Sequence, residues 1–295
     1  MILIQNLTKS YGIDKGVFDL SFSVNKGEIF GFIGPNGAGK TTTIRHLLGF
    51  IHSDQGKCSI MGMDTIDFAP RIQEFLGYLP GEIAFFDHMT GIEFLRLLLS
   101  MRNIKNETRM HELIQYFDLD TKVRIRKMSK GMKQKLGLIA AFMHNPEILI
   151  LDEPTSGLDP LMQSKFISLI LDEKRKGKTV LMSSHSFEEI ERTCDRSGII
   201  KNGRLVALEN IKTLKENQRK IYIVHFNKIS DLEKIQKKGF DVVNRNENIL
   251  EIAILGDVNH LLQELSECNI LSLDIKRLTL EEIFMKYYMR GETHE

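Results

Sequence analysis

One glycine-rich octapeptide constrains the fold of this chain more than any other segment. Its sequence is Gly34-Pro35-Asn36-Gly37-Ala38-Gly39-Lys40-Thr41, which fits the pattern G-x-x-x-x-G-K-[ST]. An apolar run at residues 29–33 precedes it, and residues 41–50 follow it with the apolar spacing of a helix. In such a strand–loop–helix, glycines let backbone N–H groups close around phosphate oxygens, and the helix N-terminus favours negative charge. The sequence therefore predicts a loop that binds the phosphates of a nucleotide.

Three side chains at the end of this loop carry specific expectations. The Lys40 ammonium is expected to reach the β- and γ-phosphates. The Thr41 hydroxyl is expected to coordinate Mg²⁺, and Thr42 is expected to lie near the α-phosphate.

The other apolar runs indicate what surrounds the loop. Residues 148–151 and 179–182 are nearly unbroken apolar runs, like 29–33, and this pattern is typical of strands buried on both faces. Strands that alternate with helices predict a largely parallel sheet covered by helices. The first residues differ, because 2–7 and 18–24 alternate between apolar and polar positions, which predicts half-buried strands of an antiparallel sheet.

Two domains are expected. Residues from about 84 to 141 have helical spacing, which predicts a helical insertion in the sheet domain, and Asn202-Gly203 predicts a hairpin turn. We place the first domain at residues 1–210 and a second domain at 211–295. The expected fold class is α/β: a P-loop NTPase parallel-sheet core with an antiparallel N-terminal sheet and a helical insertion, plus a small α+β C-terminal domain.

The second domain has its own expected order of elements. It comprises a strand at 221–226, a helix at 232–238, a hairpin over 242–255, a helix at 258–268, a strand at 271–275, and a last helix capped by Thr279 with Glu282 at the third following position. This order predicts a compact α+β unit.

Acidic and imidazole side chains follow two of the buried strands. Asp152 and Glu153 end the strand at 148–151, on the side of the sheet where ligands of such folds bind. Asp152 is expected to bind Mg²⁺ mainly through water, and Glu153 to orient and polarise an attacking water. His185 follows the next strand, 32 residues after Glu153. The sequence thus predicts a phosphoryl-transfer site at this edge.

A second turn makes the assignment narrower. Met128-Ser129-Lys130-Gly131-Met132-Lys133-Gln134-Lys135 precedes the strand that ends in Asp-Glu. Together with that strand, it resembles the signature motif and Walker B strand of ATP-binding cassette (ABC) ATPases. The usual signature is Leu-Ser-Gly-Gly-Gln, so Met128, Lys130 and Met132 depart from it. Ser129 and Gly131 remain, and a hydroxyl and a backbone N–H at a helix start are the groups that bind a γ-phosphate.

The resemblance implies roles for several residues. It implies an ATPase that uses ATP and Mg²⁺, with residues 1–210 as the nucleotide-binding domain. Ser129 and Gly131 are then expected to act on a nucleotide held by a second cassette, in a homodimer or heterodimer. His185 is expected to contact the γ-phosphate and the partner's loop at 156–159, and Tyr11 to stack on the adenine.

One loop departs from the family pattern. The family usually has a glutamine directly after the proline of this loop, where it senses Mg²⁺ and relays the nucleotide state, but this chain has Gly81 after Pro80. Glu82 is a candidate to replace it, and a solvated loop acid is the alternative. Next to this loop lie Phe85, Phe86 and Met89. In relatives this neighbourhood docks a membrane subunit, although core contacts within the insertion explain these side chains equally well.

Composition narrows the class of protein. With 42% hydrophobic and 27% charged residues and a net charge of +1, the chain of 295 residues has the composition of a globular protein, and no nucleic-acid partner is expected. Three scattered cysteines predict neither disulfides nor a zinc site. No apolar run approaches the roughly 18 residues of a membrane span, and the first residues lack the pattern of a signal peptide.

Taken together, these features predict the ATPase subunit of an ABC transporter at the cytoplasmic face of the cell membrane, with separate integral membrane permease subunits. The segment 278–284 resembles the accessory domain of export-type relatives, which favours an exporter. One alternative is a soluble ABC ATPase that transports nothing and acts in DNA maintenance or on ribosomes. Relatives that act in DNA maintenance carry a long coiled coil between the phosphate loop and the signature, whereas only 89 residues separate Lys40 from Ser129 here. The other alternative is a nucleotide-sensing regulatory module, against which Glu153 and His185 argue.

Overall fold

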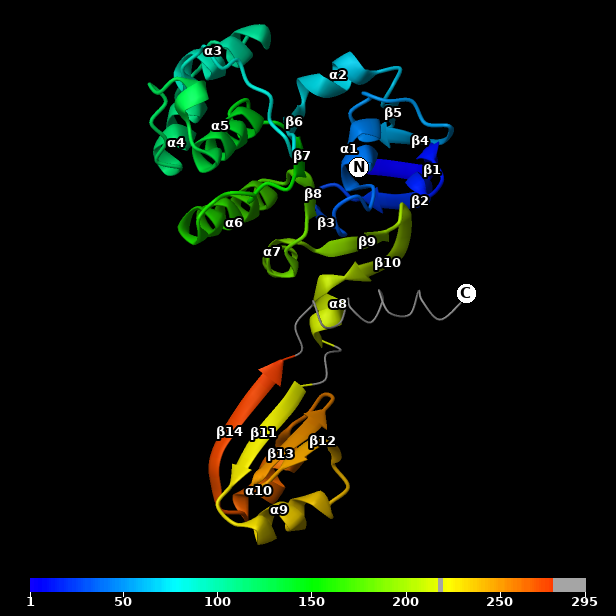
Figure 1. Ribbon diagram of the computed structural model, residues 1–295, viewed down its shortest axis with the longest axis vertical. Helices are drawn as coiled ribbons and strands as arrows, with labels where there is room; N and C mark the ends of the chain where they lie inside the picture. Colours follow the sequence, from blue (N-terminus) through cyan, green and yellow to red (C-terminus); the bar gives the residue numbers. More distant parts are fainter. Residues whose placement is uncertain (217–219, 278–295) are drawn as a thin grey trace. The chain divides into compact units, whose positions relative to one another are not determined.

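The computed structural model describes residues 1–216 and 220–277 (Figure 1). The chain divides into two compact units, the first at Met1–Glu209 and the second beginning at Asn210. The expected last helix, with Thr279 and Glu282, and the export-type segment 278–284 lie outside the described residues.

A six-stranded sheet forms the centre of the first unit. Its spatial order is β10-β9-β3-β8-β7-β6. The strands are β3 (Ile29–Ile33), β6 (Leu76–Leu79), β7 (Ile148–Asp152), β8 (Thr179–Ser184), β9 (Arg196–Lys201) and β10 (Arg204–Asn210). Strands β6, β7, β8, β3 and β9 pair in parallel. Every residue of β3, β7 and β8 is buried, as their continuous apolar sequences predict.

A second sheet lies beside the first, and it is antiparallel as predicted. Its order is β2-β1-β4-β5, from β1 (Ile2–Gly12), β2 (Lys15–Val24), β4 (Gln55–Ile60) and β5 (Met63–Asp64). Helix α1 (Lys40–Leu47) lies between the two sheets (Figure 1). Ile44 and Leu47 of α1 share one buried core with Ile2 and Ile4 of β1 and with Phe32 of β3. This core fixes the start of α1 against the end of β3.

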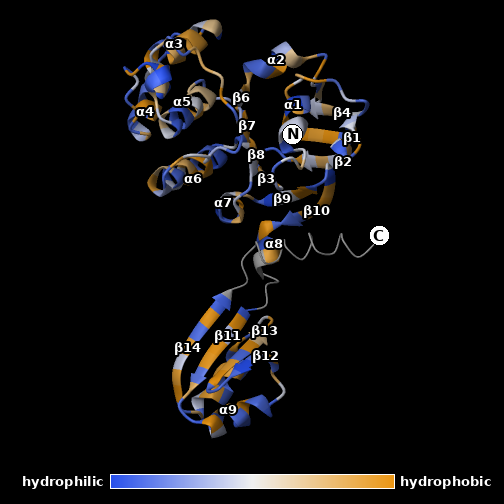
Figure 2. Cartoon of the chain, in the orientation of Figure 1, coloured by the Kyte–Doolittle hydropathy of each residue, from blue (hydrophilic) through white to orange (hydrophobic). Residues whose placement is uncertain are grey.

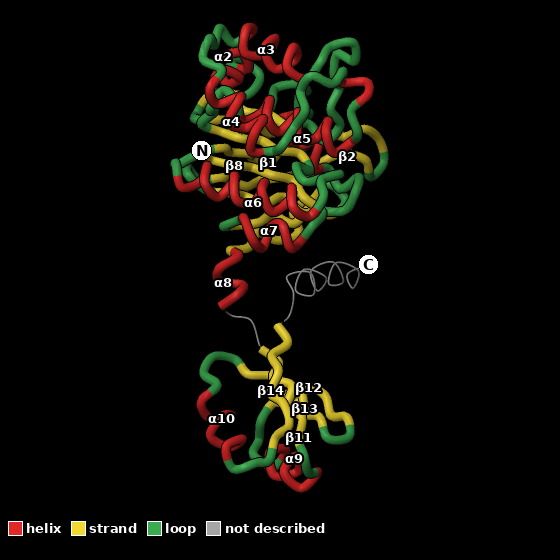
Figure 3. Tube along the Cα trace, turned by 90° about the vertical axis from the view of Figure 1, so that its left-hand side faces the viewer, coloured by secondary structure: helices red, strands yellow, loops and turns green. Residues whose placement is uncertain are grey.

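Helices α6 (Pro160–Arg175) and α7 (Phe187–Thr193) run across one side of the strands in Figure 3. Gly31 of β3 permits the close packing of α7, because a Cβ atom at Gly31 would lie 2.6 Å from the Ile190 Cδ1 atom. Helix α7 therefore packs directly against the central strand.

The structure contains the helical insertion that the sequence predicts in the sheet domain. It comprises α3 (Gly91–Met101), α4 (Thr108–Tyr116), a 3-10 turn at Ile125–Lys127 and α5 (Lys130–Phe142). Thr90 and Glu93 start α3 with reciprocal side-chain-to-backbone hydrogen bonds, the capping-box arrangement. The short helix α2 (Ala69–Glu74) precedes β6.

The second unit has the order β-α-β-β-α-β after helix α8 (Ile211–Glu216). Its elements are β11 (Lys220–Phe226), α9 (Ile229–Gln236), β12 (Asp241–Asn246), β13 (Ile249–Ile254), α10 (Asn259–Ser266) and β14 (Ile270–Arg277). The antiparallel order β12-β13-β11-β14 is that of a ferredoxin-like fold. Figure 2 shows hydrophobic and hydrophilic residues alternating along β11 and β14, as expected for strands with two different faces.

None of the helices formed by residues 1–216 and 220–277 combines the length and the apolar character that crossing a membrane requires.

Candidate active site

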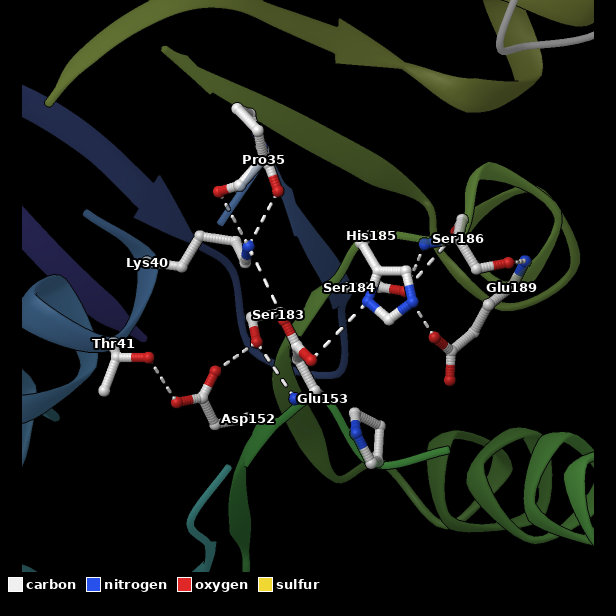
Figure 4. A network of polar contacts seen from close by, with 12 residues as sticks. Pro35, Lys40, Thr41, Asp152, Glu153, Ser183, Ser184, His185, Ser186 and Glu189 are labelled. Atoms are coloured by element: carbon white, nitrogen blue, oxygen red, sulfur yellow. Dashed lines mark hydrogen bonds and ion pairs between the residues drawn. The ribbon is translucent and has the colours of Figure 1, made fainter. Parts of the chain in front are cut away.

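The phosphate loop joins β3 to α1, as the octapeptide predicts. Gly39 is the residue before α1 and has a φ of 108°, a conformation that favours glycine. The Lys40 Nζ atom donates hydrogen bonds to the carbonyl oxygens of Gly34 at 2.7 Å and Pro35 at 3.2 Å (Figure 4). The Lys40 side chain is thereby buried within its own loop, and its ammonium lies at the point where the loop encloses an anion.

Asp152 connects this loop to the next strands. The Thr41 hydroxyl donates to Asp152 Oδ2 at 2.7 Å, and the Ser183 hydroxyl donates to Asp152 Oδ1. The Asp152 side chain is buried, so these two hydroxyls supply hydrogen bonds to a carboxylate that water does not reach freely. A hydroxyl and a carboxylate at the edge of a phosphate site are the oxygen ligands that Mg²⁺ takes together with water and phosphate. Thr41 and Asp152 therefore fit the magnesium site expected from the sequence.

Glu153 lies at the centre of the site. Its Oε1 atom is 3.6 Å from Lys40 Nζ, and its Oε2 atom is 3.5 Å from His185 Nδ1 (Figure 4). Its φ is 49°, in the left-handed region that a residue with a side chain rarely adopts. Such a backbone costs on the order of 1–3 kcal/mol and persists only where surrounding contacts enforce it. The turn at Glu153 therefore aims the carboxylate toward the phosphate loop at a cost in stability.

The loop that carries His185 is supported from behind by α7. Ser184 Oγ accepts from the Ser186 N–H at 2.9 Å and donates to Glu189 Oε2 at 2.5 Å. Burial raises the pKa of Glu189 to about 7; the Ser184 and Thr155 hydroxyls oppose the rise, and the Glu153 charge adds to it. The other carboxyl oxygen of Glu189 makes no hydrogen bond within the described parts of the chain. His185 itself has an exposed side chain.

The signature turn begins α5, as predicted. Ser129 precedes the helix, and its Oγ atom accepts from the Met132 N–H at 3.2 Å. Ser129 and Lys130 are exposed. A Cβ atom at Gly131 would lie 3.0 Å from the Gly157 carbonyl oxygen, so this glycine lets the turn approach the loop after Glu153. The exposed Ser129 hydroxyl does not line the cavity over the phosphate loop of its own chain, which suits a group that contacts another chain.

A cavity of about 580 Å³ covers the phosphate loop. Its lining comprises Gly16, Asn36, Gly37, Gly39, Lys40, Thr41, Thr42, Arg45, Tyr78, Pro80, Gly81, Glu82, Lys130, Asp152, Glu153 and Ser156. The predicted residues outside this lining are Tyr11, Gly34, Pro35, Ala38, Ser129, Gly131 and His185. Tyr11 is 56% exposed near the end of β1, so its ring is accessible to a base.

The loop that departs from the family pattern, at Pro80 to Glu82, lies directly beside Asp152. A Cβ atom at Gly81 would lie 3.2 Å from Asp152 Oδ2, so the Gly81 backbone occupies the space next to this carboxylate. Glu82 is exposed, lines the cavity, and makes no ion pair among residues 1–216 and 220–277. The Phe85 and Phe86 rings both pack near Phe94, with centroids 5.2 Å and 6.3 Å away, and Phe86 remains 50% exposed.

Comparisons with known proteins agree with this geometry. The profile described as "ABC transporter" matches residues 17–156, and that described as "ATP-binding protein DrrA1-3-like, C-terminal domain" matches residues 208–288. The bacitracin transport ATP-binding protein BcrA of Bacillus licheniformis is 33% identical over 98% of this chain and 95% of its own length. The chain belongs to the ABC transporter family of ATP-binding proteins.

Further relatives of this ABC ATPase are similar in sequence or in fold. The linearmycin resistance ATP-binding protein LnrL of Bacillus subtilis (strain 168) is 37% identical over 70% of this chain and 68% of its own. A structure titled as the ATP binding subunit of an ABC transporter has 32% identity and a TM-score of 0.66, over 73% of this chain and 92% of that chain. A dimeric bacterial ABC transporter cassette, 22% identical, has the same fold with a TM-score of 0.66 over 72% and 99%.

These findings confirm the predicted family, fold and ATPase activity, and they favour the transporter subunit over a soluble cassette without a transport role. Sequence reasoning missed three side chains that the structure brings to the ABC site. Ser183 bonds Asp152, Glu189 supports the His185 loop, and Gln134 contacts the turn at Glu153. Gln134 lies in the signature segment without an expected role of its own, and the contacts of Ser183 and Glu189 appear only once the strands and helices pack.

Proposed function

We propose that this ABC ATPase pairs with a second cassette around two ATP molecules and drives separate integral membrane permease subunits at the cytoplasmic face of the cell membrane. Export is the proposed direction, because relatives are named for bacitracin transport and linearmycin resistance. Residues 1–210 are assigned as the nucleotide-binding domain and 211–295 as the accessory domain. The observation that carries the proposal is the position of Glu153 between Lys40 and His185, beside the Thr41–Asp152 contact.

The phosphate loop binds and positions ATP. The backbone N–H groups from Asn36 to Thr42 surround the phosphates, and Lys40 exchanges its loop carbonyls for the β- and γ-phosphates. The Thr41 hydroxyl and Asp152, the latter mainly through water, would hold Mg²⁺, and the ion would neutralise phosphate charge there. Hydrogen bonds from two hydroxyls fix the Asp152 carboxylate, which holds it in position beside the phosphate loop.

Glu153 orients the attacking water. Its carboxylate lies within 4 Å of one group on either side, Lys40 Nζ at 3.6 Å and His185 Nδ1 at 3.5 Å, so its direction is set before a water arrives. Phosphoryl transfer depends mainly on positioning and charge stabilisation, which is what this arrangement supplies. His185 adds a contact to the γ-phosphate, and its exposed ring is accessible to a second cassette.

The remaining assignments concern groups at the rim. Ser129 and Gly131 bind the γ-phosphate in the second cassette's site, since both belong to an exposed helix start. The exposed ring of Tyr11 stacks on adenine. Glu82 would hold Mg²⁺ in place of the missing glutamine, because it lines the cavity beside Gly81.

Purification from native membranes tests the transport assignment. We expect the tagged chain to copurify with an integral membrane protein, and the ATPase rate of this assembly to change when the pair is reconstituted into lipid vesicles. A cytosolic fraction prepared in parallel serves as the control. Recovery only with ribosomes or nucleic acid would contradict the proposal.

A further inference from the structure

Gln134 is a buried amide near the start of α5. Its Nε2 atom donates to the Pro154 carbonyl oxygen at 2.8 Å and to the Glu153 carbonyl oxygen at 3.3 Å. The side chain is 6% exposed, so water does not readily replace these bonds. Gln134 is thus a side chain of the helical insertion that donates hydrogen bonds to the backbone of the Asp-Glu turn.

That turn needs support, because Glu153 has a φ of 49°. On the side of β8, the Glu153 N–H donates to the Ser183 hydroxyl at 3.0 Å and to the Ser183 carbonyl at 3.2 Å. On the side of α5, Gln134 binds the carbonyl group of the same residue. The backbone of Glu153 is therefore fixed at its N–H by the sheet and at its C=O by the insertion.

Helix α5 touches the same loop a second time. A Cβ atom added at Gly131 would lie 3.0 Å from the Gly157 carbonyl oxygen, so the backbones at these two glycines lie close together. The Ser156 N–H closes the turn by donating to the Glu153 carbonyl at 3.1 Å. A shift of α5 along or around its axis would therefore move the loop from Glu153 to Gly157 with it.

We propose that Gln134 is a positioning residue that couples the signature helix α5 to the Glu153 carboxylate of the same chain. This inference rests on the proposed role of Glu153. Because Ser129 at the start of α5 is assigned to the ATP of the second cassette, Gln134 makes alignment of one site depend on occupancy of the other. Removing its two hydrogen bonds slows hydrolysis and leaves the phosphate loop able to bind ATP.

Steady-state hydrolysis by the full chain tests this coupling. Gln134→Met keeps the length and the packing but removes the donor, and we expect kcat to fall by about 10- to 100-fold with KM for ATP unchanged within about twofold. Gln134→Glu places a carboxylate against two carbonyl oxygens. Its activity relative to the original chain should rise as pH falls from about 8 to about 6, since the protonated acid donates again.

Tyr116→Phe is the matched control. The Tyr116 hydroxyl of α4 donates to the Lys165 carbonyl of α6 at 2.8 Å. It therefore also joins the insertion to a helix outside it, but it does not reach Glu153. We expect its kcat to equal that of the original chain. A Gln134→Met protein with unchanged kcat, or with kcat lowered only as much as Tyr116→Phe, would overturn the inference.

A third variant separates this inference from the proposed function. If Glu153→Gln abolishes hydrolysis while Gln134→Met does not slow it, only the coupling is wrong. If Glu153→Gln hydrolyses ATP at the original rate, the proposed role of Glu153 is wrong, and the coupling fails with it.

Discussion

The phosphate loop and the signature turn each begin a helix, yet their surroundings are opposite. At the start of α1, Gly39 provides no side-chain cap, which leaves backbone N–H groups available, and Lys40 beside it is buried. At the start of α5, Ser129 caps the helix with its own hydroxyl and is exposed. The loop is completed within the chain by Thr41 and Asp152. The difference supports the proposal that one half-site is assembled by folding and the other by association with a second cassette.

The largest effect is expected from a substitution in the half-site assembled by folding. Glu153→Gln should lower phosphate release by about 1000-fold, because the amide keeps the shape but polarises water poorly. Equilibrium ATP binding should remain, and size-exclusion chromatography with ATP should show a larger dimer fraction.

Glu147→Gln is the control for this substitution. Glu147 precedes β7, at the opposite end of the strand that leads to Glu153, and its side chain is exposed. Normal phosphate release is expected. An equal loss in both proteins would mean that the effect comes from the strand rather than from the carboxylate at its end.

The second prediction breaks the half-site assembled by association. Ser129→Arg should lower hydrolysis by about 100-fold, since a bulky cation replaces a hydroxyl at an exposed helix start. ATP affinity of the monomer, measured by titration calorimetry, should stay unchanged, because Ser129 does not line the cavity of its own chain. Ser100→Arg introduces the same charge at an exposed position of α3 and should remain active. Weakened ATP binding by the Ser129→Arg monomer would assign the turn to its own chain.

The smallest expected effect concerns Glu189 of α7, which supports the His185 loop. The pKa of Glu189 is raised from its ordinary 4.5 to about 7 in the folded chain. Its contribution to stability is fully present below pH 4.5 and is lost as pH rises to about 7, a total of roughly 3 kcal/mol. Glu189→Gln cannot ionise and still accepts from Ser184, so urea unfolding at several pH values should show a flatter profile.

Glu188→Gln provides the comparison for that experiment. Glu188 is the preceding residue of α7, and its exposed carboxylate pairs with Arg192 at 3.3 Å. The free energy of unfolding of this variant should follow the pH dependence of the original chain. If Glu189→Gln also follows it between pH 4.5 and pH 7, the buried carboxyl is not the group responsible.

Much of the fold is predictable from the sequence because burial leaves a direct pattern. The continuous apolar runs of β3, β7 and β8 are required wherever helices or a second sheet cover both faces of a strand. Strand β6 is different, since its four residues include Gly77, and pairing with β7 makes it a strand. The local sequence alone does not predict that pairing.

The same distinction applies to the site. Lys40, Thr41 and Asp152 follow from motifs in which adjacent residues do the chemistry, so their residue types are informative by themselves. Gln134 contacts Glu153 only because α5 packs beside the turn, and its sequence context is an ordinary polar helix surface. The roles of supporting side chains depend on distances that only the folded chain defines.

The second unit has a consequence for evolution. Its described core consists of side chains from the unit itself, with those of α9 and α10 packed on the sheet: Tyr222, Val224, Phe226, Leu232, Ile235, Leu250, Ile252, Leu261 and Leu265. A module stabilised from within can be inherited, duplicated or recombined as one piece.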